Sequence, residues 1–418
     1  MRSIALAFTI LLLGNLRSDE NPVEVVAAIS QRASTAPQIL FTVTEVSCGP
    51  GKTPCLFTQN IWTIKADGSG ARQLTNFTIK GNVCSAPAWS PDGSTILFGC
   101  TANPRDANKS DNVLHYWTMN AEGSDLRPLP GRIWDPAWSP DGQKLAFISS
   151  RSLDDSVNQH GPVSGNIWVM NSDGHGAAPI TQLTSDIVTA RYVLWSPDGS
   201  KLAFPSNRAL DGSDRRNGKE GIFNLWMVNA DGSEARPLTR FTAVGINVLN
   251  VKWSPDGKRL AFLSNCAHDG RDALAGDLNT NIWVAKPDGS GVQALTQFHN
   301  VSVRDLDWSP DGIRLAFSST GALDGSDAAN LHFTQNIWVM KADGSSAFPL
   351  TRATEFGYDN GYPLWSPDGT MISFTSAHLR SNSNQLTGDI RVIKPDGSSL
   401  VPLTHFIDRA AVATAWHR

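Results

Sequence analysis

The sequence predicts an all-β protein, a seven-bladed β-propeller with four antiparallel strands in each blade. The first observation behind this prediction is the motif Trp-Ser-Pro-Asp-Gly, which occurs six times. The second is Asn-Ile-Trp or a close variant, which interleaves with the first motif and ends in a copy that carries Arg391 in place of Trp. The motifs return about every 55 residues, a period typical of propeller blades and other repeat arrays.

The composition is that of a globular chain. The 418 residues are 40% hydrophobic and 18% charged, and the net charge is −4. Disordered chains have less apolar content, and a general nucleic-acid binder needs an excess of positive charge. We therefore expect a folded protein without a nucleic-acid partner.

Each repeat contains four strands in order. The first is a short entry into Trp, such as 135–138, and the following Ser-Pro-Asp-Gly suits a tight turn. Residues 144–148 and 166–170 form the second and third strands, and 236–239 illustrates the brief fourth strand. Neighbouring blades cover both faces of these strands, so small and apolar residues fill them. Thirteen of the fourteen tryptophans fall on two repeat positions where they can pack between blades, and Trp134 is off register.

The two ends of the chain carry the unmatched strands. Residues 38–41 resemble a second strand with no first strand before it, and residues 415–416 resemble a first strand with no second strand after it. We expect the C-terminal strand to pair with three N-terminal strands and so complete one blade, which leaves no unpaired inner edge. An open solenoid is the alternative.

The N-terminus indicates export. Residues 1–18 contain an early Arg, an apolar run and a polar segment, as in a signal peptide. A membrane anchor is the alternative, although the run is short for a bilayer span. We expect a signal peptide over 1–18, a short segment over 19–37 and the propeller domain over 38–418. The mature protein is expected to be periplasmic or secreted, with no transmembrane span.

Cysteine spacing agrees with an oxidising compartment. Cys84 and Cys100 lie symmetrically about a Ser-Pro-Asp-Gly turn, so they face each other across a hairpin at a separation that a disulfide can bridge. Cys48 and Cys55 close a short loop and form the second candidate pair. Cys266 is left over, and five reduced cysteines are the alternative.

Loop lengths identify the face on which function is expected. The turns between the first and second strands, and between the third and fourth, are short and uniform. Connections from the second to the third strand, such as 206–223, 264–280 and 318–335, reach nearly twenty residues, and those from the fourth strand to the next repeat, such as 240–250 and 352–362, about ten. Long loops in a compact domain commonly carry function, so we expect a ligand on this face.

Aromatic and charged residues just before the innermost strands are the ligand-binding candidates. Such residues suit a peptide or a sugar in a shared funnel. Packing at the strand entrance is an equally good reading for Tyr192 and Tyr362. The candidates are Trp134, Arg191, Tyr192, Arg304, Asp305, Tyr358 and Tyr362.

Three of the long connections share a pair of aspartates that could bind calcium. The pattern lacks the further carboxylates of a dedicated calcium loop, and turn formation is the favoured reading. We expect no cofactor, with calcium as the alternative. The aspartates are Asp211, Asp214, Asp269, Asp272, Asp324 and Asp327.

No contiguous catalytic motif is present. The sequence contains no Gly-x-Ser-x-Gly, His-Glu-x-x-His, phosphate-binding or dinucleotide-binding pattern. Histidines in the long connections could meet at the funnel and hold a metal ion. They are His160, His268, His299, His332, His378 and His405.

The repeat resembles the WD40-like propeller repeat of the TolB family. The similarity rests on WSPDG-x-LAF, NIWVM-ADGS and PLT and covers about residues 38–416. It implies a periplasmic protein of the cell envelope; similar repeats form the substrate-gating propeller of some serine peptidases and the catalytic propeller of oligogalacturonate lyases. We expect an exported, non-catalytic module that binds or scaffolds protein, peptide or glycan. The alternative is a propeller enzyme, a metal-assisted polysaccharide lyase or hydrolase that uses histidines of the long-loop face.

Overall fold

The structure is a computed structural model in which every regular element of the described residues is a β-strand. No helix in this part of the chain is long and apolar enough to cross a membrane. The predicted signal peptide lies outside the described residues. These residues are 37–47, 56–79, 81–150, 165–184, 188–217, 222–243, 246–266, 279–326, 328, 334–355, 358–379, 386–406 and 409–417.

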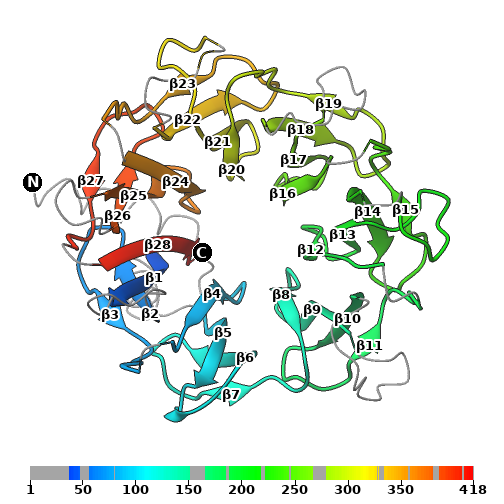
Figure 1. Cartoon of the computed structure of the whole chain (residues 1–418), viewed down its shortest axis with the longest axis horizontal. Helices are drawn as coiled ribbons and strands as arrows, with labels where there is room; N and C mark the ends of the chain where they lie inside the picture. The colour runs from blue at the N-terminus through cyan, green and yellow to red at the C-terminus, as the bar shows by residue number, and fades with distance from the viewer. Residues whose placement is uncertain are drawn as a thin grey trace, which may run out of the picture.

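The strands form sheets arranged as a ring around a central axis, as a β-propeller requires (Figure 1). Five of the sheets have four strands, each with a short strand at its outer edge or beside the axis. In chain order these sheets are β4(Cys84–Trp89), β5(Thr95–Asn103), β6(Asp106–Asn120) and β7(Arg127–Pro128); β8(Trp134–Trp138), β9(Lys144–Ser149), β10(Asn166–Asn171) and β11(Ala178–Pro179); β12(Leu194–Trp195), β13(Lys201–Ser206), β14(Asn224–Asn229) and β15(Arg236–Pro237); β16(Val248–Trp253), β17(Leu260–Ser264), β18(Asn281–Ala285) and β19(Gln293–Ala294); β20(Val303–Trp308), β21(Arg314–Ser319), β22(Asn336–Lys341) and β23(Phe348–Pro349).

The sixth sheet has eight strands and joins the two ends of the chain. It contains β24(Tyr358–Trp365), β25(Ile372–Leu379), β26(Leu386–Ile393), β27(Val401–Pro402), β28(Arg409–Trp416), β1(Gln38–Ser47), β2(Leu56–Lys65) and β3(Arg72–Gln73). β28 pairs with β1 in antiparallel register, with Phe41 opposite Ala413, as the sequence predicted. β28 meets β26 through a single parallel pair, Gly388 with Ala410, so the sheet consists of two four-stranded groups joined at one point.

The Trp-Ser-Pro-Asp-Gly motif builds a turn closed by its own side chains. In the second copy, the Ser139 hydroxyl donates to Asp141 (2.5 Å) and accepts from the backbone N–H of Lys144 (2.9 Å). Gly142 takes φ 69°, a conformation that side chains disfavour. These bonds fix the hairpin between the innermost strand and its neighbour, which explains why the motif is repeated.

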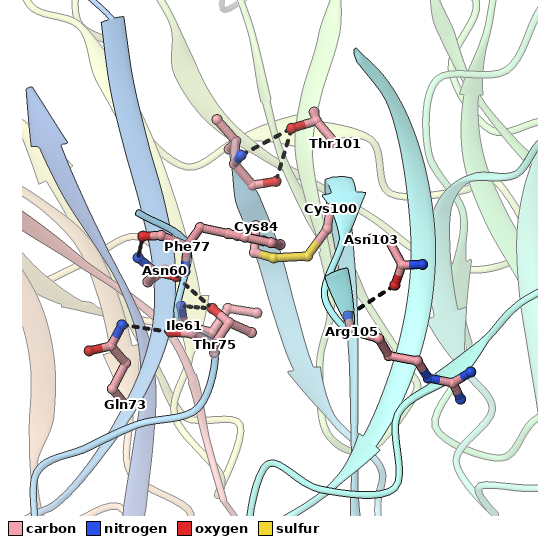
Figure 2. The surroundings of a disulfide bond; sticks show 11 residues. Asn60, Ile61, Gln73, Thr75, Phe77, Cys84, Cys100, Thr101, Asn103 and Arg105 are labelled. Atoms are coloured by element: carbon pink, nitrogen blue, oxygen red, sulfur yellow. Dashed lines mark hydrogen bonds between the residues drawn. A yellow bond between two sulfur atoms is a disulfide. The ribbon is translucent and has the colours of Figure 1, made fainter. Parts of the chain in front are cut away.

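The Asn of Asn-Ile-Trp ties the third strand to the fourth. Asn60 accepts from the Thr75 hydroxyl (3.1 Å) and the Phe77 N–H (2.8 Å) and donates to the Phe77 carbonyl (3.0 Å); Figure 2 shows these three residues. Asn166, Asn224 and Asn281 repeat these bonds, because a buried polar group needs partners.

Tryptophans pack between the sheets, as expected. Trp168, Trp226 and Trp283 are at most 1% exposed. Three tryptophans of the other repeat position also donate their indole N–H to a carbonyl of the preceding four-stranded sheet or group: Trp195 to Ala137 (3.2 Å), Trp308 to Lys252 (3.3 Å) and Trp416 to Leu364 (3.1 Å). The Trp of Asn-Ile-Trp thus supplies core volume, and in these three copies the Trp of the other position also links neighbouring four-stranded groups.

The predicted disulfide between Cys84 and Cys100 is present and joins β4 to β5 (Figure 2). The two Cα atoms are 4.2 Å apart, and both residues are fully buried. Cys266 is a buried thiol. The second candidate pair, Cys48 with Cys55, lies outside the described residues.

Candidate functional site

The innermost strands, which surround the central axis of the ring, carry irregularities in their pairing (Figure 1). In β4, β8, β16 and β24 the register shifts a few residues before the tryptophan. At each shift a residue other than glycine has a positive φ: Ala86, Asp135, Asn250 and Tyr362. Such β-bulges re-aim side chains and cluster near functional sites, and left-handed backbone at these residues must be held by its surroundings.

A side-chain oxygen from the preceding sheet holds three of these bulges. The Asp135 N–H donates to the Tyr116 hydroxyl (3.3 Å), the Val251 N–H to the Tyr192 hydroxyl (3.2 Å), and the Tyr362 N–H to the Asp305 carboxylate (3.2 Å). Tyr192 and Asp305, both ligand-binding candidates, therefore link adjacent sheets.

Burial raises the pKa of Tyr116 and of Tyr192 to about 12, so both hydroxyls keep their protons at neutral pH. Of the two readings of Tyr192, the structure favours packing at the strand entrance. Tyr116 was missed, although it stands where most repeats have the Ile of Asn-Ile-Trp, and a hydroxyl in that place was the available signal.

A polar cluster lies where the innermost strands β20 and β24 of neighbouring sheets meet, beside the central axis of the ring. The buried amide of Gln335 accepts from Arg304 Nε (3.1 Å) and donates to Asp359 Oδ1 (2.7 Å). Arg304 and Asp359 also form an ion pair with 3.5 Å between Nη1 and Oδ2, and their side chains are 60% and 50% exposed. Gln335 thus orients an arginine and a carboxylate that both remain open to solvent. We call Arg304, Asp305, Gln335, Asp359 and Tyr362 the channel cluster.

Burial and neighbouring charges raise the pKa of two groups in the channel cluster. Burial raises the pKa of Asp359, Arg304 opposes the rise and the Asp305 carboxylate adds to it. Burial, followed by Asp305 and Asp359, also raises the pKa of Tyr362, a residue that is 52% exposed. The cluster therefore presents a guanidinium, two carboxylates and a neutral phenol, a set that can bind a charged end or side chain of a peptide.

The structure brings only three of the seven ligand-binding candidates into this cluster. Arg304, Asp305 and Tyr362 meet there, together with Gln335 and Asp359, which were missed. Asp359 follows the candidate Tyr358 directly, and its position in the same connection was the available signal.

The remaining candidates have other neighbours. Tyr358 stacks on His378 with ring centroids 5.3 Å apart, and Arg191 lies 3.8 Å from the ring centroid of Phe223. Trp134 is half-buried against the core of the neighbouring sheet and begins β8. Arg191 and Trp134 belong to sheets other than those of the channel cluster.

The candidate calcium ligands bond within their loops or to a neighbouring connection. Asp211 accepts from the Ser213 N–H (2.8 Å) and pairs with Arg215 (3.1 Å), and Asp324 accepts from the Ser326 N–H (2.9 Å). Asp214 accepts from the Thr184 hydroxyl (2.5 Å). Asp269, Asp272 and Asp327 lie outside the described residues.

Among the residues that the structure describes, no group of three or more His, Cys, Asp or Glu side chains could hold a metal ion. Of the candidate histidines, His299, His378 and His405 belong to this part of the chain. His160, His268 and His332 lie outside it, so the predicted meeting of histidines at the funnel stays a prediction.

Comparison with known proteins gives one curated relative over part of the chain and many similar solved structures. No known protein-family model matches it. It is 32% identical over 130 residues to the uncharacterized peptidase YuxL of Bacillus subtilis; these residues are 31% of this chain, and the chain spans only 17% of that relative's length.

Solved structures support the β-propeller fold. The acylaminoacyl peptidase of Pyrococcus horikoshii matches with a TM-score of 0.55 and 12% identity over 89% of this chain and 52% of that one. The propeller domain of the trilobed protease from Pyrococcus furiosus matches with the same TM-score and identity over 90% and 94%. An oligogalacturonate lyase from Vibrio parahaemolyticus matches with a TM-score of 0.51 and 17% identity over 77% and 82%. TolB structures match with TM-scores of only 0.43 and 0.44.

These findings correct the expectation of a non-catalytic binding or scaffold module. The finding that overturns it is the curated relative, 32% identical over 130 residues, which is named as a peptidase. The expectation rested on the lack of contiguous catalytic motifs. That reasoning is not sufficient, because the residues of an active site can come from segments far apart in the sequence and then leave no contiguous pattern.

Proposed function

We propose that this chain is the propeller of an enzyme that acts on peptides. The observation that carries the proposal is the 32% identity to a protein named as a peptidase. The peptidase structures with TM-scores above 0.5 support it at the level of the fold. The peptide enters or lines the axial channel, and the channel cluster contacts it.

Within this proposal each member of the channel cluster has a chemical role. Arg304, held by Gln335 and Asp359, binds a carboxylate of the peptide, since a guanidinium matches a carboxylate with paired hydrogen bonds. The carboxylates of Asp305 and Asp359 favour a cationic group nearby, and the exposed ring of Tyr362 offers an apolar surface with a polar tip.

We further propose that the eight-stranded sheet counts as two blades, which makes the propeller seven-bladed. The single pair between Gly388 and Ala410 supports this division, because the strands within each group pair extensively. A periplasmic or secreted location with a cleaved segment over 1–18 and a TolB-like origin of the repeats belong to the same proposal. The disulfide between Cys84 and Cys100 supports the location, since such bonds persist in oxidising compartments.

A polysaccharide lyase or hydrolase is the second candidate. A structure titled as an oligogalacturonate lyase in complex with manganese matches over 87% of its own length with a TM-score of 0.51. Such coverage favours an enzyme made mainly of a propeller. The described residues offer no set of ligands for a metal ion, so we derive no metal-dependent step.

One assay separates the two candidates. The full chain is incubated with a peptide library and, separately, with oligogalacturonate in the presence and absence of Mn²⁺, and mass spectrometry detects the products. The peptide proposal predicts cleaved peptides and unchanged oligogalacturonate. Cleaved sugar with intact peptides establishes the lyase reading, and no product from either substrate contradicts both.

An Arg304→Ala variant tests the role of the channel cluster. Loss of a charge-assisted hydrogen bond is expected to raise KM for the best-cleaved peptide about tenfold. Arg215→Ala is the matched control, because Arg215 also forms an exposed ion pair with an aspartate (3.1 Å) but lies in another connection. Equal KM values for the two variants would show that Arg304 does not contact the substrate.

A further inference from the structure

A pocket of 440 Å³ lies between the sheet of β4–β7 and the sheet of β8–β11, on the side of the short turns. This face lies opposite the long connections, on which the loop lengths predicted a ligand. Its walls include Thr95 from one sheet and Trp138, Gly142 and Ser172 from the next. Comparison of the repeats shows which side chain is too short to fill this pocket.

In an equivalent cleft between two other sheets, an arginine occupies the space. The Arg259 guanidinium lies 4.9 Å from the ring centroid of Trp308, in a cation–π contact. Its two terminal nitrogens donate to the carbonyls of Gly312 (3.1 Å) and Ala342 (3.0 Å). Arg314 repeats the stacking on Trp365 at 4.8 Å. The chain therefore builds a guanidinium receptacle from a tryptophan and two carbonyls.

The open pocket has the same receptacle without the arginine. Arg259 is the sixth residue after Trp in its motif, and Thr95 is the sixth residue after Trp89. By the same count, Trp138 stands where Trp308 does, Gly142 where Gly312 does, and Ser172 where Ala342 does. A threonine is too short to reach the indole, so the cleft that an arginine fills elsewhere stays open here.

At two other clefts between neighbouring four-stranded groups, a histidine or a methionine lies near the tryptophan. The imidazole of His417 meets the Trp89 ring edge-on with centroids 5.0 Å apart. Met371 packs against the core cluster that contains Trp416. The sixth residue in the two remaining repeats is a lysine, Lys144 or Lys201. Thr95 is thus the shortest side chain at this repeat position.

The charge of the pocket suits a cation. Asp92, Asp125, Asp141 and Asp173 line it together with Arg127, which pairs with Asp125 at 2.8 Å. Hydrogen bonds from Ser90 and Ser139 lower the pKa of Asp92 and of Asp141, so both carboxylates are charged at neutral pH. Four carboxylates against one guanidinium give the pocket a negative potential.

We propose that this pocket binds an arginine side chain of a peptide or protein partner. The incoming guanidinium stacks on Trp138 and donates to the backbone carbonyls of Gly142 and Ser172, as Arg259 does within the chain. An arginine is preferred over a lysine, because a planar fork can stack on the indole and donate to two carbonyls at once. This inference does not depend on the proposed peptidase activity, since the pocket is separate from the channel cluster.

The test uses the full chain labelled with 5-fluorotryptophan and titrated with acetyl-arginine amide or acetyl-lysine amide. The fluorine resonance of Trp138 is assigned with Trp138→Phe. Acetyl-arginine amide is expected to shift this resonance and to bind about tenfold more tightly than the lysine probe, a difference within the range of cation–π and paired hydrogen-bond energies. An unshifted Trp138 resonance, or equal binding of the two probes, would overturn the proposal.

Three further variants sharpen the result. Thr95→Arg supplies the chain's own guanidinium and should abolish binding at Trp138, whereas Thr95→Val keeps the side chain short and should bind like the wild type. Arg259→Thr should open a second receptacle, seen as a new probe-dependent shift at Trp308. Undiminished binding to Thr95→Arg contradicts the proposal. If Thr95→Arg fails to fold, Arg259→Thr still decides the matter, because no new shift at Trp308 also contradicts it.

Discussion

Asn224 offers a sharp test of how the repeat holds its strands together. It begins β14, is 0% exposed, and accepts from the Thr239 hydroxyl and the Phe241 N–H, both at 2.8 Å. Asn224→Ala leaves these two buried donors without this acceptor, whereas the Phe241 carbonyl keeps its bond from Asn217 (3.1 Å). Each orphaned buried donor costs about 1–3 kcal/mol, so we expect a loss of about 3 kcal/mol in the free energy of unfolding.

Chemical denaturation of the wild type and the variant measures this loss. Asn229→Ala is the control, since Asn229 ends the same strand and its side chain makes an exposed bond to Ser233 (2.9 Å). The control should cost about 0.5 kcal/mol or less. A loss for Asn224→Ala no larger than that of the control would refute the account of the Asn-Ile-Trp motif.

Three other predictions concern the sheet contacts, the turns and the chain ends. Tyr192→Phe removes the acceptor of the Val251 N–H (3.2 Å) and should lower the free energy of unfolding by about 1 kcal/mol, measured by denaturation; no change would show that the bulge does not need this hydroxyl. The Ser196 hydroxyl, followed by the Ser200 N–H, lowers the pKa of Asp198 from 3.8 to about 2, so the ionised carboxylate stabilises the fold above pH 4 and this stabilisation is lost as the pH falls toward 2. Asp198→Asn should therefore make the melting temperature depend less steeply on pH between 4 and 2. An unchanged pH dependence would show that Asp198 is not its source. Deletion of 409–418 removes β28 and exposes the edge of β1, so the thermal transition followed by circular dichroism should broaden and shift downward; an unchanged transition would count against closure through the chain ends.

The repeat made most of the fold predictable. Trp-Ser-Pro-Asp-Gly locates a turn because Ser139, Asp141 and Gly142 bond within one short segment. Pairing of 38–41 with 415–416 followed from strand counting, and the Cys84–Cys100 bond followed from symmetry about a turn. All these features follow from the position of a segment within the repeat.

The candidate site was predicted only in part because it forms between sheets. Gln335 and Asp359 meet Arg304 through the packing of neighbouring sheets, which no local pattern encodes. Tyr192 lies before an innermost strand, as predicted, but its hydroxyl accepts the Val251 N–H of the next sheet. The open pocket is visible only when Thr95 is compared with Arg259 at the same repeat position.

Hydrogen–deuterium exchange of the full chain with a non-cleavable analogue of its best-cleaved peptide tests the central claim most directly, namely that the channel cluster binds the substrate. The account predicts slower exchange at the backbone amides of 303–308 and 358–365, which carry or adjoin Arg304, Asp305, Asp359 and Tyr362. Slower exchange confined to other segments, with these two unchanged, would contradict it.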